Sequence, residues 1–169
     1  MKKFILSLSV CSLALLCSNC SDKDSKVIVE IPDVNFKTYL LDFFDENNDG
    51  NLSLSEAKAI KEINVSGKEI ERLDGIEKFA NLESLDCSDN LLDELELRYN
   101  KKLNKLVCTG NKVPLTVYIG MSSPLRNQNV TKPKENEPPQ MANIAVKPID
   151  ESKCTYDHET TNIYLSFED

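Results

Sequence analysis

Between residues 60 and 113, apolar residues recur in three segments that share one internal spacing. The segments begin at Ile60, Leu82 and Leu103, so the step is 22 residues and then 21. In each segment, apolar side chains stand at the first, fourth and sixth positions and at about the eleventh. A fixed period of this length predicts stacked coils, each formed by one segment. The eleventh position falls on Ile70, Leu92 and Val113.

Turn residues follow the sixth position. Asn90 and Asn111 occupy matching places in the second and third segments, whereas Lys68 stands there in the first. An asparagine amide can bond the backbone where a coil turns. We therefore expect short parallel strands at 84–88 and 105–109, with their apolar side chains inward. The competing interpretation, an amphipathic helix pair, gives no reason for cysteine and asparagine to share this phase.

The second halves of the first two segments differ from each other. Residues 70–79 carry Leu73, Ile76 and Phe79 at helical spacing, which predicts a short helical return. The following segment alternates Leu95 and Leu97 with polar residues, which predicts a short strand on the opposite side of the coil.

Ahead of the repeats, a helix is expected to open near Pro32 and Asp33. A shorter exit helix is expected over 55–61. The first helix has an aromatic face that can serve as core sealing the first coil or as a target groove of the calcium-sensor type. Sealing is favoured, because a stacked repeat needs its open end covered and no second calcium loop is present. The face consists of Phe36, Tyr39, Leu40, Phe43 and Phe44.

The chain between these two helices, DENNDGNLSLSE, has the spacing of a twelve-residue calcium loop. Ca²⁺ takes six to eight oxygen ligands, and Gly50 stands where such a loop turns sharply. The alternative is a polar turn in which Ser53 and Glu56 form only a helix capping box. The expected ligands are Asp45, Asn47, Asp49, the Asn51 carbonyl, Ser53 and a bidentate Glu56.

Residues 31–113 resemble bacterial leucine-rich-repeat surface lipoproteins. The first repeat looks internalin-like, the next two look like the 21-residue cysteine type, and residues 31–60 look like an EF-hand-like cap. The resemblance implies an α/β fold: a short solenoid of about three repeats with a helix–calcium loop–helix cap. It also implies a non-enzymatic module that binds a protein or glycan. Relatives usually have more repeats, so the concave surface here is short.

The N-terminus predicts export. Lys2 and Lys3 precede an apolar run over 4–16, which is too short to span a bilayer. The following LCSNC resembles a lipoprotein signal with Cys20 as the lipidated residue, and the acidic SDKD after it resembles a surface-export signal. The membrane is then reached through the lipid anchor only, at the outer membrane or cell surface. The alternatives are a plain secretory signal and use of Cys17.

The chain is acidic, with a net charge of −8. Removing residues 1–19 takes away two lysines and no acid, so the net charge becomes −10. This charge argues against nucleic acid and anionic membrane surfaces as partners. It suits a calcium-rich exterior.

Cys87 and Cys108 fall at equivalent inward positions of neighbouring coils. We expect buried thiols that pack as small apolar groups, and a disulfide between them is the alternative in an oxidising compartment. Cys154 has no partner in this arrangement. His158 beside it can be a metal ligand or part of a solvated turn, and the turn is favoured.

The predicted organisation has six parts. These are a signal peptide (1–19), a tether (20–31), the cap (32–61), the repeats (60–120), a Pro-rich linker (121–141) and a C-terminal β segment (142–169) with strands at 143–149 and 162–167.

Catalysis has little support in this sequence, which holds one histidine and no Gly-rich phosphate loop. The leading hypothesis is a calcium-stabilised binding module. A calcium sensor or buffer, and an accessory subunit of a surface enzyme system, are the alternatives. Ligand binding is expected on the outward residues of the repeat strands: Glu62, Asn64 and Ser66, then Ser84, Asp86 and Ser88, then Lys105, Val107 and Thr109.

Overall fold

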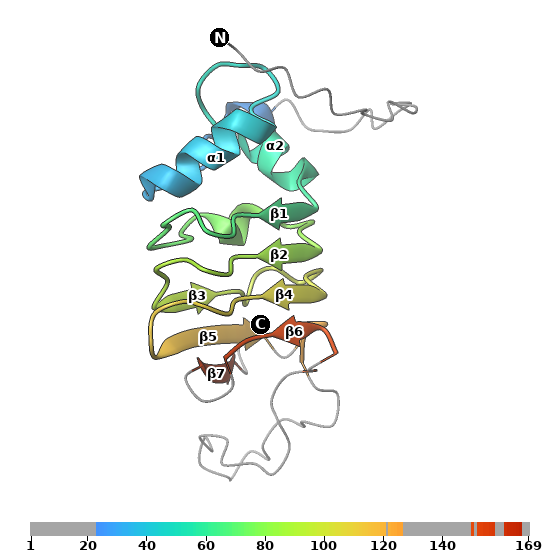
Figure 1. Ribbon diagram of the computed structural model, residues 1–169. Helices are drawn as coiled ribbons and strands as arrows, with labels where there is room; N and C mark the ends of the chain where they lie inside the picture. The colour runs from blue at the N-terminus through green and yellow to red at the C-terminus, as the bar shows by residue number, and fades with distance from the viewer. Residues whose placement is uncertain (1–22, 121, 127–149, 151, 158–160, 167–169) are drawn as a thin grey trace, which may run out of the picture.

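The computed structural model describes residues 23–120, 122–126, 150, 152–157 and 161–166. Its body is a stack of coils with parallel strands along two sides and two helices at one end (Figure 1). One sheet has the order β1 (Glu62–Asn64), β2 (Ser84–Asp86), β4 (Lys105–Val107), β6 (Cys154–Thr155). The other has the order β3 (Glu94–Glu96), β5 (Leu115–Gly120), β7 (Thr161–Ser166).

The expected α/β class with parallel repeat strands is confirmed. Leu85 of β2 pairs with Ile63 of β1 and with Leu106 of β4, and all three side chains are buried. The regular strands are shorter than expected, because they end at Asp86 and Val107. Backbone bonds continue there: the Gly67 N–H donates to the Ser88 carbonyl at 3.0 Å.

Two asparagines, Asn90 (buried) and Asn111 (half-buried), hold the turns of successive coils together. The Asn90 amide donates to the Val65 carbonyl at 2.8 Å, and its oxygen accepts the N–H groups of Lys68 and Ile70, each at 3.0 Å. Asn111 repeats the arrangement one coil later and accepts the Leu92 N–H at 3.1 Å. The predicted role of both asparagines is confirmed.

Val113 was expected inward and is instead 68% exposed. The reason lies in the register of the two sheets. The step from the second coil to the third is 21 residues at Ser84–Lys105 but 22 residues at Glu94–Thr116. The third coil therefore gains one residue between β4 and β5. Val113 lies in this longer connection, and the inward positions resume at Leu115 of β5.

The cap consists of α1 (Val34–Phe44) and α2 (Leu54–Ala59), which lie across the first coil (Figure 1). Phe36 and Leu40 of α1 are fully buried, and the Phe36 ring lies 6.4 Å from that of Phe79 in the first coil. This packing supports the sealing interpretation of the aromatic face. Phe43 differs, because 68% of it is exposed.

Asp33 joins the cap to the first coil. One carboxylate oxygen accepts the Phe36 N–H at 2.9 Å as the N-cap of α1. The other accepts the N–H groups of Glu71 at 2.8 Å and Arg72 at 3.2 Å. One side chain thus satisfies backbone donors on two elements.

The segment before α1 is more than a tether. After a short 3₁₀ helix, η1 (Asp24–Lys26), Ile28 forms an antiparallel bridge with Ser53, and Val29 and Ile31 are buried. The later part of the expected tether, 20–31, therefore packs in the core.

The expected helical return of the first coil is a single 3₁₀ turn, η2 (Ile76–Lys78). It begins after Gly75, whose φ of 96° lies in the left-handed region. A Cβ there would also collide with the Ile31 side chain and the Glu30 carbonyl oxygen. Glycine is therefore required, because the N-terminal segment passes directly over it.

The C-terminal strands extend both sheets beyond the third coil. β6 pairs with β4, and β7 pairs with β5 over its full length. Leu125 is fully buried and its carbonyl accepts the Asp150 N–H at 2.8 Å, so the start of the expected linker is packed. β7 matches the strand expected at 162–167.

Several predictions fall outside the described residues. These are the signal peptide, Cys20, most of the linker, the strand at 143–149 and His158. Within the residues that are described, no helix is both long and apolar enough to cross a membrane.

Candidate functional site

In the loop between α1 and α2, side-chain oxygens accept hydrogen bonds from the loop's own backbone. Asp45 accepts the N–H groups of Asp49 at 3.2 Å and Gly50 at 2.9 Å. Asn47 Oδ1 also accepts the Asp49 N–H, and Asp49 Oδ1 accepts the Asn51 N–H, both at 2.8 Å. Gly50 has a φ of 79°, which provides the sharp turn. The side-chain oxygens of Asp45, Asn47 and Asp49, at loop positions 1, 3 and 5, are therefore held in place by backbone N–H groups of the same loop.

Glu56, at loop position 12, forms the capping box of α2. Its Oε2 accepts the Ser53 N–H at 2.8 Å and the Ser53 hydroxyl at 2.7 Å, and Ser53 Oγ accepts the Glu56 N–H at 3.2 Å. Its Oε1 accepts the Glu46 N–H at 3.1 Å. Loop positions 9 and 12 are thus the same residues as the N-cap and N3 positions of the helix. The alternative interpretation, a polar turn before a helix, predicts this capping box. A calcium loop predicts it as well, because the same residues begin its exit helix.

The chemistry of the donor set fits calcium. Carboxylate, amide and hydroxyl oxygens are the ligands that this hard cation takes, and a carboxylate oxygen that accepts one N–H retains a second lone pair. Asp45, Asn47, Asp49, the Asn51 carbonyl, Ser53 and Glu56 are the residues that would hold the ion, which would cross-link the ends of α1 and α2. Among the described residues, no three His, Cys, Asp or Glu side chains are grouped as metal ligands. Calcium binding therefore stays a prediction.

The outward residues of the repeat strands share one face. Register places Glu62, Ser84 and Lys105 in one row, and Asn64 and Asp86 in the next. Glu62, Asn64 and Lys105 are exposed and Ser88 is buried, whereas the other expected contact residues are half-buried: Ser66, Ser84, Asp86, Val107 and Thr109. This face is polar and has no aromatic ring among the predicted contact residues.

Asp86 also has a structural task on that face. Its Oδ1 accepts the Ser88 hydroxyl at 2.6 Å and the Ser88 N–H at 3.1 Å. Asn64 bonds Ser66 in the same manner one coil earlier, at 2.9 and 3.1 Å. These side chains are fixed by the turn that follows each strand, so the face is held in one arrangement before any ligand binds.

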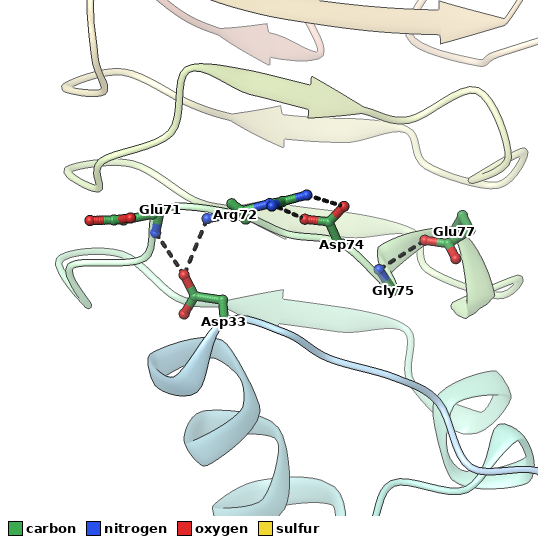
Figure 2. Close-up of polar contacts among 6 residues, drawn as sticks. All are labelled: Asp33, Glu71, Arg72, Asp74, Gly75 and Glu77. Atoms are coloured by element: carbon green, nitrogen blue, oxygen red, sulfur yellow. Dashed lines mark hydrogen bonds and ion pairs between the residues drawn. The ribbon is translucent and has the colours of Figure 1, made fainter.

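A groove on the other side of the coils was not predicted. It has a volume of about 610 Å³ and runs between residues 71–77 of the first coil and residues 93–96 around β3. Arg72 pairs with Asp74 through Nε at 2.7 Å in this region (Figure 2). The Asp74 hydrogen bond raises the pKa of Arg72, and the Asp93 and Glu94 carboxylates contribute smaller increases. The only sequence signal was the density of acids in ERLDGIE and DELE.

Three buried thiols lie along the first sheet. Cys87, Cys108 and Cys154 are free cysteines, so the alternative disulfide is not formed. Burial raises the pKa of Cys87 well above its ordinary value, and raises the pKa of Cys108 and Cys154 to about 12. Neutral, desolvated thiols are poor nucleophiles. Their place is in the core.

No protein-family model matches the chain, and no curated protein matches it. Similar solved structures include CBM51-2 and INT domains of ZmpB from Clostridium perfringens in complex with GlcNAc, at 26% identity and a TM-score of 0.46, covering 57% of this chain and 20% of that one. An internalin (inlF) from Listeria monocytogenes is 22% identical with a TM-score of 0.46, covering 53% and 30% of the two chains. This chain thus spans less than a third of either.

Proposed function

We propose that this chain is a calcium-stabilised leucine-rich-repeat binding module, held by a lipid at Cys20 on the outer membrane or cell surface. It binds a protein or glycan ligand without catalysing a reaction. The observation that carries the proposal is the in-register stack of β1, β2 and β4. That stack presents a fixed polar face, while the apolar side of each strand is buried in the core.

The cap supports a structural task for the ion. Phe36 and Leu40 already seal the first coil, so α1 is a part of the fold rather than a movable arm. An ion held by Asp45 and Glu56 would fix the exit of α1 to the start of α2. A ligand that binds only the folded state adds RT ln(1 + [L]/Kd), about 2.7 kcal/mol when calcium is at 100 times its Kd.

Calorimetry and thermal unfolding test the calcium site. We expect one Ca²⁺ per chain and a lower melting temperature in chelator. Asp45→Ala or Glu56→Gln should remove the difference between calcium and chelator. Asp42→Ala, an exposed acid on α1 outside the ligand set, is the control and should keep the difference. A calcium-dependent shift that survives Glu56→Gln contradicts the site.

Binding to the polar face should be weak for a single domain. Protein hot spots favour Trp, Tyr and Arg, and the predicted contacts include none of them. Many copies on one cell surface raise the effective affinity. Combining Asp86→Lys with Lys105→Glu should reduce ligand capture. Because Asp86 also accepts two bonds from Ser88, Lys105→Glu alone is the variant that should weaken capture and leave the melting temperature nearly unchanged. Pull-downs against surface polymers and proteins, with and without calcium, measure this.

Lipidation at Cys20 has its own test. Mass spectrometry of membrane-associated protein should find an acylated peptide that begins at Cys20. A free N-terminus at another residue, on fully soluble protein, contradicts this part of the proposal and leaves the binding face untouched.

A calcium sensor is the second candidate function, and one observation favours it. Phe43 is 68% exposed, and its ring lies 4.8 Å from Tyr39 and 6.5 Å from Phe44. A sensor would open this aromatic cluster when calcium binds. A dye that fluoresces on exposed apolar surface measures this. The same fluorescence with and without calcium would exclude that opening.

A further inference from the structure

The groove on the second side of the coils borders a strand with a free edge. Among the described residues, β3 lies at the end of its sheet, with β5 as its only strand partner. On its other side, residues 71–75 of the first coil run nearby but form no backbone hydrogen bond with 93–96 in the described chain. The first coil thus lacks a strand where the second and third coils have β3 and β5 (Figure 1).

The first coil uses its backbone donors in another way. The N–H groups of Glu71 and Arg72 go to Asp33, and the Gly75 N–H goes to Glu77 Oε2 at 2.9 Å (Figure 2). These bonds tie residues 71–75 to the cap and to η2. Because these donors are used there and none is donated to β3, the edge of β3 stays open at the groove.

The floor of the groove is apolar and its walls are charged. Leu73 and Ile76 are almost fully buried beneath it, and the ring of Tyr99, 56% exposed, stands among its lining. The lining holds six carboxylates against one arginine and one lysine. Three of these carboxylates form no ion pair within the described residues: Glu71, Asp93 and Glu94.

We propose that this groove binds an extended, lysine- or arginine-rich segment of a partner protein, which adds as a strand to the free edge of β3. Strand addition supplies main-chain bonds, and alternate side chains supply specificity. The acids on the two walls select basic side chains. A second copy of this chain is disfavoured, because each copy carries a net charge of −8. This site lies on the other side of the coils from the predicted polar face, so the proposal does not depend on that face.

The test uses the full chain and a defined probe. The probe is a fluorescent peptide of about six residues, a common strand length, in which lysine and valine alternate. A peptide that alternates glutamate and valine is the charge control. Two N-methylated versions of the lysine peptide remove the N–H groups on one edge or on the other, since alternate N–H groups point to opposite sides of a strand.

The lysine peptide should bind, and the glutamate peptide should not. One N-methylated version should bind about tenfold more weakly and the other about equally, because only one edge of the peptide meets β3. Absence of binding by the lysine peptide, binding by the glutamate peptide, or equal binding by all lysine peptides overturns the proposal.

Variants locate the site. Combining Asp93→Lys with Glu94→Lys should weaken binding by about tenfold. The matched control combines Asp42→Lys with Glu46→Lys, which changes the net charge equally at exposed positions elsewhere, and should leave binding within about twofold. Circular dichroism checks that both variants fold, and Glu71→Lys on the opposite wall serves as a second probe if the first does not. Equal losses in the groove and control variants overturn the proposal.

Discussion

At the N-terminal end the stack is covered by a helix pair formed from contiguous residues, whereas at the C-terminal end its last strands come from a distant part of the chain. α1 and α2 bring Phe36, Leu40 and Ala57 into the core. The other end is assembled from β6 and β7, with Cys154 pairing with Leu106, 48 positions earlier. The same parallel stack is thus closed by local structure at one end and by long-range pairing at the other.

The difference teaches where the stability of a short repeat protein resides. Repeat arrays gain stability from the interface between neighbouring units, and each end unit has only one such interface. The cap compensates with large fully buried side chains and with the Asp33 link to the first coil. The last coil has the smaller buried side chains of Leu125 and Cys154, a half-buried Ile163 and a pair of stacked tyrosines.

The largest expected effect comes from removing the anchor of the cap. Phe36→Ala deletes a fully buried ring next to Phe79 and should cost about 3–5 kcal/mol of unfolding free energy. Leu125→Ala, the matched core truncation near the C-terminal end, should cost about 2 kcal/mol, the lower end for such changes. Urea unfolding measures both. Equal losses would remove the distinction between the two ends.

Asp33 tests whether the cap and first coil unfold together. Asp33→Ala removes an N-cap and leaves the Glu71 and Arg72 N–H groups without their acceptor, so we expect a loss of about 1–2 kcal/mol. Asp33→Asn keeps an acceptor for the helix and should lose less. Hydrogen exchange should show faster opening of α1 than of β2. Uniform acceleration across both would show that Asp33 does not join separable units.

The buried thiols give a pH dependence. Unfolded thiols have a pKa of about 8.5, whereas burial in the folded chain raises the pKa of Cys108 and Cys154 to about 12. The folded chain therefore keeps protons that the unfolded chain loses, and stability should fall as pH rises from about 8.5 toward 12. Below about pH 8.5 this contribution is fully present. Replacing the three cysteines with alanine should flatten the decline in a series of urea melts.

The same thiols compare the last coil with the interior of the stack kinetically. Mass-spectrometric labelling of the native chain should modify Cys154 first, because a terminal coil opens at lower free-energy cost than the interior. Cys87 should react last. Rapid labelling of Cys87 in the folded state would contradict its buried place between coils.

The smallest expected effect concerns the outer surface of the last coil. Tyr164 stacks on Tyr118 at 5.5 Å, with an interplanar angle of 25°. Tyr164→Ala should cost about 0.5–1 kcal/mol. Tyr99→Ala removes an exposed ring without a ring partner in the described residues and should change stability by less than about 0.5 kcal/mol. Thermal melts of both variants make the comparison.

Much of the middle of the molecule could be predicted from its sequence. Leu85 and Leu106 share a register because a strand that turns one face to the core tolerates no one-residue slip. Asn90 was predictable for a related reason, since a buried turn needs a donor and acceptor in one side chain. Both inferences rest on repetition along the chain.

Other features depended on contacts that repetition does not encode. Val113 fits the pattern, but it lies in the connection that carries the added residue of the third coil, and the inward positions resume only at Leu115. Val29 and Ile31 lie outside the repeats, and their burial follows from the bridge between Ile28 and Ser53. The groove beside β3 exists because the first coil has no strand at that place. No sequence motif signals a missing strand, so the groove could not be predicted.

The distant pairing of β6 also gives the chain a direction of folding. The first three coils pair residues about 21 positions apart, so each closes over a short loop, whereas β6 must close over more than twice that length. Loop-closure entropy and slow long-range pairing place the last coil at the end of the folding sequence. A chain that is synthesised from its N-terminus can therefore complete the cap and the first coils while its C-terminal strands are still unpaired.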